Sequence, residues 1–482
     1  MTLGTTPNPL RVAIVGSGPS AFYAAEHLQK QSDLVIQIDM FERLPTPHGL
    51  VRGGVAPDHP KIKTVTKVYD KIATHENFRY FGNVEFGRDI THADLVQHYH
   101  QIIYATGAQT DRQMGIPGED LPGSHAATEF VGWYNAHPDY RDLTFDLSQE
   151  AVAVIGNGNV AMDVARILAS TYEELAATDI ADYALEALKN SRVRDIYVLG
   201  RRGPAQAAFT SPELRELGEL QGAEVIVRPE DAELDPLSAD DLLKSTDRTA
   251  ERNVQTLARY ASSPLQGKPR RLHMRFLVSP VELIGTERVE AIKLVKNELY
   301  RSDDGSLRPR PTNQFETIPV GLVFRSIGYK GVPLPDVPFD ARNAVIPNAQ
   351  GRVLDPENNR TVTGEYVVGW IKRGPSGIIG TNKPDSVETV NHMLEDLRSG
   401  TTLHPAQPNR ESVVKLLESR GVQYVTYSDW LVLDTIEQEK GQAVNRPRIK
   451  FSRIEDMLNV VREHKGIPAV VQSTTGRSTD AD

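Results

Sequence analysis

The chain contains two copies of one short pattern, in which an apolar strand runs through a glycine-rich turn into a helix. Residues 11–15 lead into Gly16-Ser17-Gly18-Pro19-Ser20-Ala21, and residues 151–155 lead into Gly156-Asn157-Gly158-Asn159-Val160-Ala161. In such a turn the first glycine permits the bend, the second lets the backbone approach a pyrophosphate, and the third small residue allows close packing. The helix that follows presents free N–H groups to phosphates. The pattern therefore predicts an α/β chain with two dinucleotide-binding units.

The two units differ in the residues that follow their next strand. Residues 35–41 form the next strand of the first unit and end in Glu42, about 20 residues after the turn, where a ribose-binding acid belongs. A carboxylate there accepts both ribose hydroxyls and repels a 2′-phosphate. The alternative is a plain strand–helix turn with a surface glutamate. The first unit is predicted to bind FAD or NAD through Gly16, Gly18 and Glu42.

In the second unit, the strand at residues 195–199 ends in Gly200-Arg201-Arg202. Two guanidinium groups at a strand end suit a 2′-phosphate through charge and forked hydrogen bonds. The longer spacing from turn to arginines is explained by a helical insertion at residues 173–189. The alternative is a pair of solvated arginines. The second unit is predicted to bind NADP(H).

The composition limits the chemistry further. The 482 residues include no cysteine, which excludes disulfides, cysteine nucleophiles, thiolate zinc sites and protein-held iron–sulfur clusters. Any redox chemistry must use a bound organic cofactor, and we predict no metal site. A net charge of −10 disfavours general nucleic-acid binding. Because no signal peptide and no run of ~20 apolar residues is present, we expect a cytoplasmic protein without a membrane span.

A dinucleotide site in which an acidic residue binds the ribose, together with a second site for NADP, is typical of a flavoprotein that takes hydride from NADPH. The segments that carry a family signature are residues 45–60 (PTPHGLVRGGVAPDHP), residues 81–84, the Arg201-Arg202-Gly203-Pro204 turn and residues 369–382. They resemble the adrenodoxin-reductase-type ferredoxin–NADP reductases, especially the bacterial ones. The similarity extends from about residue 11 to residue 397. The sequence departs from the family at His48, where relatives often carry a larger aromatic residue.

The resemblance implies the residues that contact each cofactor. Those expected at FAD are Ser20, Glu42, Leu50 and Val84, with Trp370, Gly377, Ile378 and Ile379 beside the isoalloxazine. Those expected at NADP are Arg112, Asn157, Gly158, Asn159, Val160, Arg201, Arg202, Glu213 and Gly377. For two of these residues another interpretation stays open: Trp370 as a core or interface aromatic, and Glu213 as a surface residue favoured near a helix start.

His59 and Asp163 are the candidate catalytic residues, His59 by the resemblance and Asp163 by its place on the helix after the second turn. Hydride transfer from nicotinamide to flavin needs no side-chain base. Both residues therefore have a second interpretation, in which they tune proton movement or hold the domains together through hydrogen bonds.

The expected fold is glutathione-reductase-like, with two Rossmann-like three-layer α/β domains. Residues 1–108 and 328–482 are expected to form the FAD domain, and residues 109–327 an NADP domain inserted into it. Residues 411–461 are predicted to be a helix–strand appendage, and the final dozen residues a disordered tail.

The predicted function is that of a ferredoxin–NADP(+) reductase, in which NADPH reduces FAD and single electrons pass to a ferredoxin. A flavin monooxygenase and a non-catalytic NADP-binding redox sensor are the alternatives. A thioredoxin-reductase-like enzyme would need a cysteine pair. An acidic ferredoxin would need a local positive surface on this acidic chain. The candidates are Lys268, Arg270 and Arg271 with Arg275, or Arg215, and otherwise Lys61 and Lys63.

Overall fold

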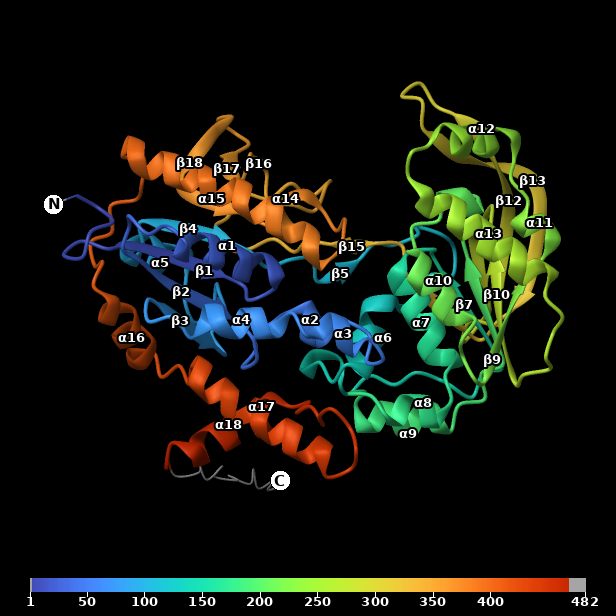
Figure 1. The fold of residues 1–482 in the computed structure, drawn as a ribbon, viewed down its shortest axis with the longest axis horizontal. Helices are drawn as coiled ribbons and strands as arrows, with labels where there is room; N and C mark the ends of the chain where they lie inside the picture. Colours follow the sequence, from blue (N-terminus) through green and yellow to red (C-terminus); the bar gives the residue numbers. More distant parts are fainter. Residues whose placement is uncertain (1, 468–482) are drawn as a thin grey trace, which may run out of the picture.

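The structure is a computed structural model, which describes residues 2–467. Two mainly parallel sheets form the centre of the fold (Figure 1). The first sheet has the strand order β16-β17-β18-β4-β1-β2-β3. Its parallel strands are β1 (Leu10–Val15), β2 (Ile36–Glu42), β3 (Phe78–Gly82), β4 (Gln101–Tyr104) and β18 (Arg360–Val367). At one edge, β17 (Arg352–Asp355) and β16 (Asn348–Ala349) add antiparallel strands.

Helices cover both faces of this first sheet. The core on one face contains residues of α1 (Pro19–Gln29), α4 (Thr66–Ala73) and α15 (Asn382–Ser399). The core on the other face contains residues of α5 (His92–His98) and α16 (Arg410–Ser419). The sheet and its two helical layers make a three-layer domain. Three short helices lie in its connections: α2 (Leu50–Gly53), α3 (Pro60–Lys63) and α14 (Trp370–Arg373).

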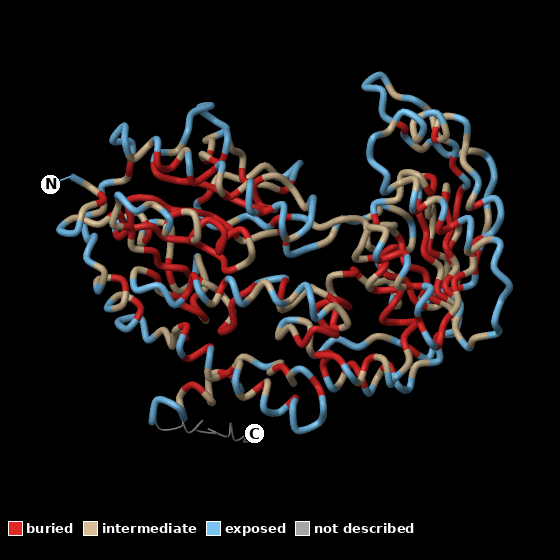
Figure 2. The backbone as a smooth tube through the Cα atoms, viewed as in Figure 1, coloured by how far each residue is buried: buried red, intermediate tan, exposed pale blue. Residues whose placement is uncertain are grey.

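The second sheet is parallel throughout, with the order β6-β14-β7-β8-β10-β9. Its strands are β6 (Ser124–Ala126), β7 (Ala151–Ile155), β8 (Asp195–Leu199), β9 (Ala223–Val227), β10 (Arg270–Arg275) and β14 (Leu322–Arg325). A separate antiparallel sheet, of β11 (Val278–Ile284), β12 (Ala291–Arg301) and β13 (Leu307–Pro319), packs on one face. Figure 2 shows the buried backbone concentrated in the strands and inner helices of both halves.

Helices cover the other face of the second sheet. Their bounds are α6 (Ala127–Tyr134), α7 (Asn159–Ala169), α8 (Tyr172–Ala176), α9 (Asp182–Lys189), α10 (Ser211–Leu217) and α13 (Arg248–Ser262). The connection between β9 and α13 holds α11 (Pro229–Ala232) and α12 (Pro236–Lys244). The helices α8 and α9 are the insertion that the sequence predicts between the second turn and Arg201.

The chain passes from one domain to the other twice. The two passages pair as a short antiparallel ribbon of β5 (Thr110–Asp111) and β15 (Tyr329–Lys330). All strands of the second sheet come from residues 124–325, between the two parts of the first sheet. The predicted fold class, with one nucleotide-binding domain inserted in the other, is confirmed. The predicted divisions at residues 108 and 327 fall in the loops that lead to this ribbon, and they stay predictions.

The prediction of a helix–strand appendage at residues 411–461 is wrong, because this segment consists of α16, α17 (Tyr427–Gln442) and α18 (Ile454–His464). Residues 422–427 are rich in strand-forming types, yet Thr426 and Asp429 form a capping box that begins α17. One isolated bridge, Gly82–Val425, joins the segment to the sheet. The predicted tail lies outside the described residues. Within residues 2–467, no helix has the length and apolar character needed to cross a membrane.

Candidate active site between two dinucleotide-binding turns

The first glycine turn forms an open cradle at the start of α1. Gly16 has φ +104°, and a Cβ on it would lie 2.5 Å from the carbonyl oxygen of Ala105. A Cβ on Gly18 would meet no atom within 4 Å, whereas one on Gly49 would lie 3.0 Å from the Cα of Gly18. Neighbouring backbone therefore packs closely against Gly16, whereas the space at the Cβ position of Gly18 is open. This shape fits a pyrophosphate at the helix N-terminus.

Glu42, at the end of β2, is oriented by the same turn. The Ser17 hydroxyl and N–H both donate to Glu42 Oε2, at 2.6 and 3.1 Å, and the Leu44 N–H donates to Oε1 at 3.1 Å. A carboxylate has about four acceptor positions, so Glu42 keeps capacity for ribose hydroxyls. Its half-buried, tethered position does not match the alternative of a free surface glutamate, and the ribose contact stays a prediction.

The segments predicted for the rest of the FAD site converge on this turn. A Cβ on Gly369 would lie 2.4 Å from Ser20 Oγ, and Trp370 follows directly. The Trp370 indole N–H donates to Ser376 O at 3.1 Å, and its ring stacks on Tyr329 with centroids 5.4 Å apart. Trp370 is half-buried, so it is not a core residue. Tyr329, which the sequence analysis missed, thus joins the predicted isoalloxazine side.

The remaining predicted FAD residues lie in two groups around the turn. Val84 is buried behind Glu42, to whose carbonyl oxygen its N–H donates at 2.9 Å, and Leu50 begins α2 with 39 % of its surface exposed. Gly377, with φ +81°, and the 61 % exposed Ile378 precede the short 3₁₀ helix Ile379–Thr381, which leads into α15. The structure brings both segments to the same end of the first sheet.

The second glycine turn repeats the geometry of the first. Gly156 has φ +132°, and a Cβ on it would lie 2.1 Å from the carbonyl oxygen of Ser326, whereas the space at Gly158 is open. The Asn157 Nδ2 atom is buried without a hydrogen-bond partner in the described part of the chain. Asn159 Oδ1 accepts the Thr210 N–H at 2.9 Å, and Val160 is half-buried in the first turn of α7. The open cradle and the free amide donor fit a phosphate group.

Arg201 and Arg202 follow β8 with their backbone fixed and their side chains free. Asn297 Nδ2 donates to Arg201 O at 2.9 Å, and the Leu277 N–H donates to Arg202 O at 3.1 Å. Neither guanidinium has a hydrogen bond or ion pair with any described residue. Burial and the neighbouring Arg201 charge lower the pKa of Arg202. Two adjacent cations without a counter-ion make a site for a dianionic phosphate. Arg112, exposed beside Gly328, is a third cation of this kind.

His59, Asp163 and Glu213 meet in one ion cluster between the domains. Arg166 on α7 lies at its centre and donates to Asp58 at 2.5 Å, Asp163 at 2.6 Å and Glu213 at 2.8 Å. His59 Nε2 lies 2.8 Å from Glu216 Oε2, and its Nδ1 lies 3.9 Å from Asp163 Oδ1. Burial raises the pKa of Asp163 to about 7, against the opposing charge of Arg166. A cavity of about 310 Å³ opens beside the cluster.

This cluster refines the sequence-based site. Glu213 is buried on Arg166, so the interpretation of Glu213 as a surface residue is wrong, and its contact with the nucleotide stays a prediction. The sequence analysis missed Arg166 and Glu216, although the i,i+3 spacing of Asp163 and Arg166 on a helix was a usable signal. His59 lies 3.9 Å from Asp163 and 2.8 Å from Glu216 across the domain boundary, which favours the second interpretation of His59 and Asp163 as a link between domains.

Part of the basic cluster predicted to receive a ferredoxin is bound within the fold. Arg275 is buried in ion pairs with Asp231 and Glu316. Arg270 donates to the carbonyl of Ser170 at the end of α7, and Arg271 pairs with Asp195. Arg275 is therefore excluded as a docking residue. Docking at Lys268, Arg270 and Arg271 stays a prediction, because a hydrogen bond to a carbonyl leaves the charge of Arg270 in place and Arg271 is exposed. Lys63 is likewise held by Asp179. Arg215 and Lys61 stay exposed, with no ion pair to a described residue.

Comparisons with known proteins agree with this geometry. Residues 10–198 match the family model of pyridine nucleotide-disulphide oxidoreductases. The chain is 46 % identical to the NADPH-ferredoxin reductase FprA of Mycobacterium tuberculosis over 94 % of its length and 99 % of the relative. It is 41 % identical to the mitochondrial NADPH:adrenodoxin oxidoreductase of Salvelinus fontinalis, covering 96 % and 93 % of the two chains. The solved structure of FprA in complex with NADPH superposes with a TM-score of 0.88 at 45 % identity, over 94 % of this chain and all of that one.

Proposed function

Because this chain belongs to the adrenodoxin-reductase-type family of ferredoxin–NADP reductases, we propose that it is an NADPH–ferredoxin reductase that carries FAD in its first domain. The predicted family is confirmed by these relatives. One observation in the structure carries the proposal furthest: two turns of the same geometry are followed by opposite charges, Glu42 in one and Arg201 with Arg202 in the other. One site rejects a 2′-phosphate and the other attracts it.

In this function the residues of the chain bind the two cofactors and orient them. The first turn and Glu42 hold the adenosine end of FAD, and Ser20, Gly369 and Trp370 line the path toward its ring. The second turn holds the NADPH pyrophosphate, and Arg201 and Arg202 hold the 2′-phosphate. FAD, when bound, supplies the redox chemistry by accepting hydride from NADPH and releasing electrons singly. The chain has no cysteine that could share in electron transfer.

The ion cluster of Arg166 holds the two domains at the site. Asp58 and His59 come from the loop before α3, whereas Asp163, Glu213 and Glu216 come from α7 and α10. These contacts cross from the FAD domain to the NADP domain. A catalytic role for His59 and Asp163 stays a prediction, and the crossing contacts support a role in domain attachment. We also propose that the protein is cytoplasmic and that its partner is a ferredoxin, with Arg215 as part of the docking surface.

An absorbance spectrum of the purified protein, followed by anaerobic titration with NADPH, tests the proposal. The expected result is a bound yellow flavin that NADPH bleaches, and ferredoxin-dependent reduction of cytochrome c. A rate of NADPH oxidation that depends on oxygen and an organic substrate, and not on ferredoxin, would favour the monooxygenase. A protein that binds NADPH but reduces neither dye nor ferredoxin would be the redox sensor.

A further inference from the structure

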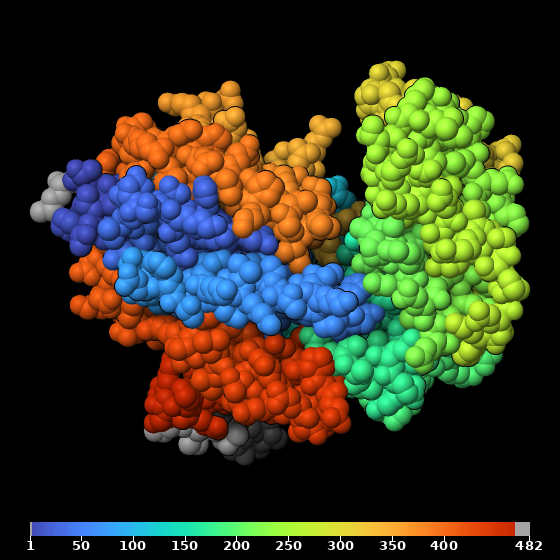
Figure 3. All heavy atoms as spheres, in the orientation of Figure 1, coloured from blue at the N-terminus to red at the C-terminus, as the bar shows by residue number. Residues whose placement is uncertain are grey.

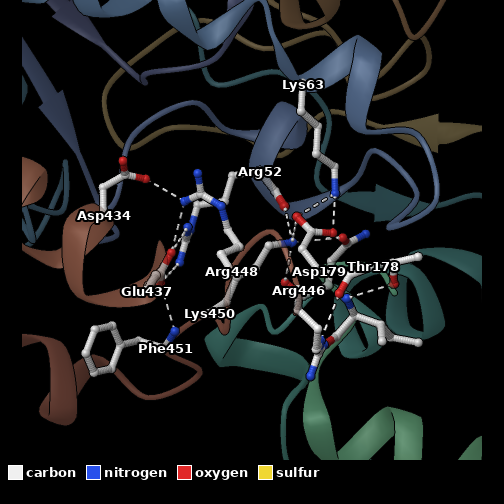
Figure 4. A network of polar contacts seen from close by, with 12 residues as sticks. Arg52, Lys63, Thr178, Asp179, Asp434, Glu437, Arg446, Arg448, Lys450 and Phe451 are labelled. Carbon is white, nitrogen blue, oxygen red and sulfur yellow. Dashed lines mark hydrogen bonds and ion pairs between the residues drawn. The ribbon is translucent and has the colours of Figure 1, made fainter. Parts of the chain in front are cut away.

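The C-terminal appendage reaches both domains through a buried polar network (Figure 4). We use the name C-terminal tie for Arg446, Arg448 and Lys450, which follow α17. Around them lie the partners Arg52, Lys63, Asn135, Thr178, Asp179, Ile180, Asp182, Asp434, Glu437 and Phe451. The side chain of Lys450 is only 2 % exposed, and that of Arg446 7 %. Charges buried to this degree are stable only when they are paired.

On the NADP side, the tie binds the loop between α8 and α9, which belongs to the helical insertion. Arg446 Nε donates to the carbonyl oxygen of Thr178 at 2.9 Å, and its other nitrogens contact the Ile180 carbonyl and the Asp182 carboxylate. Lys450 Nζ lies 3.2 Å from Asp179 Oδ2. Two backbone carbonyls and two carboxylates therefore hold this loop against the C-terminal segment.

On the FAD side, the tie is anchored to a buried carboxylate. Glu437 is fully buried and accepts hydrogen bonds from Arg52, from Arg448 at 3.2 Å and from the Phe451 N–H at 2.8 Å. Lys450 Nζ also donates to the Arg52 carbonyl at 3.2 Å. Lys63 of α3 shares Asp179 with Lys450, at 2.7 Å. The same few residues thus bind the appendage to α2, to α3 and to the insertion.

The tie lies apart from the covalent connection of the domains. That connection is the β5–β15 ribbon, approached through Gly107 (φ +70°) and Gly328 (φ +107°). Figure 3 shows the two lobes separated by a notch at the top of the view and in contact below it, where the red C-terminal segment meets the insertion. In Figure 1 the ribbon lies above α2 and α3, and the segment that follows α17 lies below them. A two-stranded ribbon alone leaves rotation free. The Arg166 cluster restrains the domains beside the site, and the C-terminal tie adds a separate attachment at the helical insertion.

We propose that Arg446 and Lys450 are positioning residues, which hold the NADP domain at the orientation that hydride transfer requires. The inference rests on the proposed function. Each cofactor binds its own domain, so the distance between nicotinamide and flavin depends on how the domains are held. A displacement of about 1 Å between reacting groups can cost roughly a hundredfold in rate. The tie contacts neither glycine turn, and among the described residues the Arg446 side chain makes polar contacts only with the segment that leads from α8 into α9. The effect of Arg446 on the reaction therefore comes through domain orientation.

The test uses Arg446→Ala and Lys450→Met in the full chain, with Arg420→Ala as the matched control. Arg420 pairs with Asp94 at 2.6 Å, and both lie in the FAD domain. We expect the rate of flavin reduction at saturating NADPH to fall about ten- to a hundredfold in the two tie variants. The KM for NADPH and the bound flavin should stay near their original values. The control should match the unmodified chain.

A second readout does not depend on NADPH oxidation. Because the chain has no cysteine, spin labels can be placed at Leu243→Cys on α12 and Arg398→Cys on α15, both exposed and one in each domain. We expect the distance distribution between the labels to broaden in the tie variants and not in the control. Arg446→Lys, which keeps the charge but loses the forked donors, should broaden it less.

Unchanged label distances in both tie variants would overturn the proposal, whatever the activity. Broadened distances with unchanged flavin reduction would also overturn it, because orientation would then not limit the rate. A chain that carries no flavin would refute the proposed function instead. If Arg446→Ala fails to fold, the partly exposed partner of this arginine provides the milder variant Asp182→Asn, for which the same two outcomes apply.

Discussion

The two glycine turns share a backbone and differ in what surrounds it. In both, the first glycine has a positive φ and is pressed against the carbonyl of a residue just after a neighbouring strand, Ala105 in one and Ser326 in the other. The first turn has its recognition residue, Glu42, already held by three donors. In the second unit, the guanidinium groups of Arg201 and Arg202 have no hydrogen bond or ion pair among residues 2–467. The recognition residue of the first turn is therefore held in place within the fold, whereas the charges of the second are open to a ligand.

The largest expected effect comes from blocking each turn in its own domain. Gly16→Ala places a Cβ within 2.5 Å of the Ala105 carbonyl, and Gly156→Ala places one within 2.1 Å of the Ser326 carbonyl, both at positive φ. We expect Gly16→Ala to yield protein without flavin. Gly156→Ala should keep its flavin, which dithionite but not NADPH reduces. The ratio of flavin to protein absorbance and anaerobic titration measure both. Loss of flavin from both variants would mean that the turns are not independent.

Removing the positive charge of the second site should invert its nucleotide preference. In Arg201→Ala with Arg202→Ala, each lost charge-assisted hydrogen bond costs about 1.5–3 kcal/mol, or roughly ten- to more than a hundredfold in binding. The KM for NADPH should rise accordingly and that for NADH should hardly change. Steady-state kinetics with both nucleotides provide the check. An equal loss with NADH would show that the arginines do not recognise the 2′-phosphate.

A smaller effect is expected from Glu42→Gln in the first site. The amide keeps the shape but offers one acceptor oxygen, and its NH₂ group would face the donors of Ser17 or Leu44. We expect the dissociation constant of FAD to rise about tenfold, which corresponds to the net value of about one hydrogen bond. Fluorescence of released FAD on dilution measures it. If even Glu42→Ala leaves this constant unchanged, the carboxylate serves only the end of β2.

The smallest effect concerns acid stability near the first turn. His48 donates its backbone N–H to Ser17 O, and burial among Phe22, Tyr69 and Trp430 lowers the pKa of its imidazole to about 3. The unfolded chain then binds more protons below pH 6.5, so stability falls as the pH drops from about 6.5 toward 3. Between pH 7 and pH 5, the unfolding free energy falls by about 2 kcal/mol through this histidine.

His48→Phe should remove that part of the pH dependence, which urea unfolding at pH 7 and pH 5 measures. The difference in unfolding free energy between the two pH values should shrink by about 2 kcal/mol relative to the unmodified chain. Tyr69, whose ring centroid lies 5.7 Å from that of His48, offers the control Tyr69→Phe, which keeps the ring and should leave the pH dependence in place. Identical curves for His48→Phe and the unmodified chain would place the imidazole in contact with water.

The sequence predicted the parts of this molecule that follow local rules. The strands at 101–104, 151–155 and 195–199 have the bounds expected from their apolar runs, because buried parallel strands need apolar residues on both faces. The contrast of Glu42 with Arg201 is also local, since Glu42 ends β2 and Arg201 comes shortly after β8. Local patterns were misleading at residues 422–427, where a helix cap overrode strand-forming residues.

Contacts between distant segments could not be predicted from the sequence. Arg446 meets Thr178 across 268 positions, and Arg52 meets Glu437 across 385. The ion pairs of Arg275 with Asp231 and Glu316 are of the same kind, and they remove Arg275 from the run of positive charge that the sequence predicts as a docking surface. Charge in a sequence shows that a partner is needed, and only the fold shows whether the partner is another residue or another molecule.

The insertion of one domain into the other determines which of the two sheets can be completed first during synthesis of the chain. The NADP sheet is complete once β14 ends at Arg325, whereas the FAD sheet lacks β18 until Val367 has been made. Because β18 is the neighbour of β4, the first four strands emerge early and wait with one edge uncovered while the whole inserted sheet is synthesised. An uncovered edge is open to wrong pairing. The half of the molecule that is begun first is therefore the last to be finished.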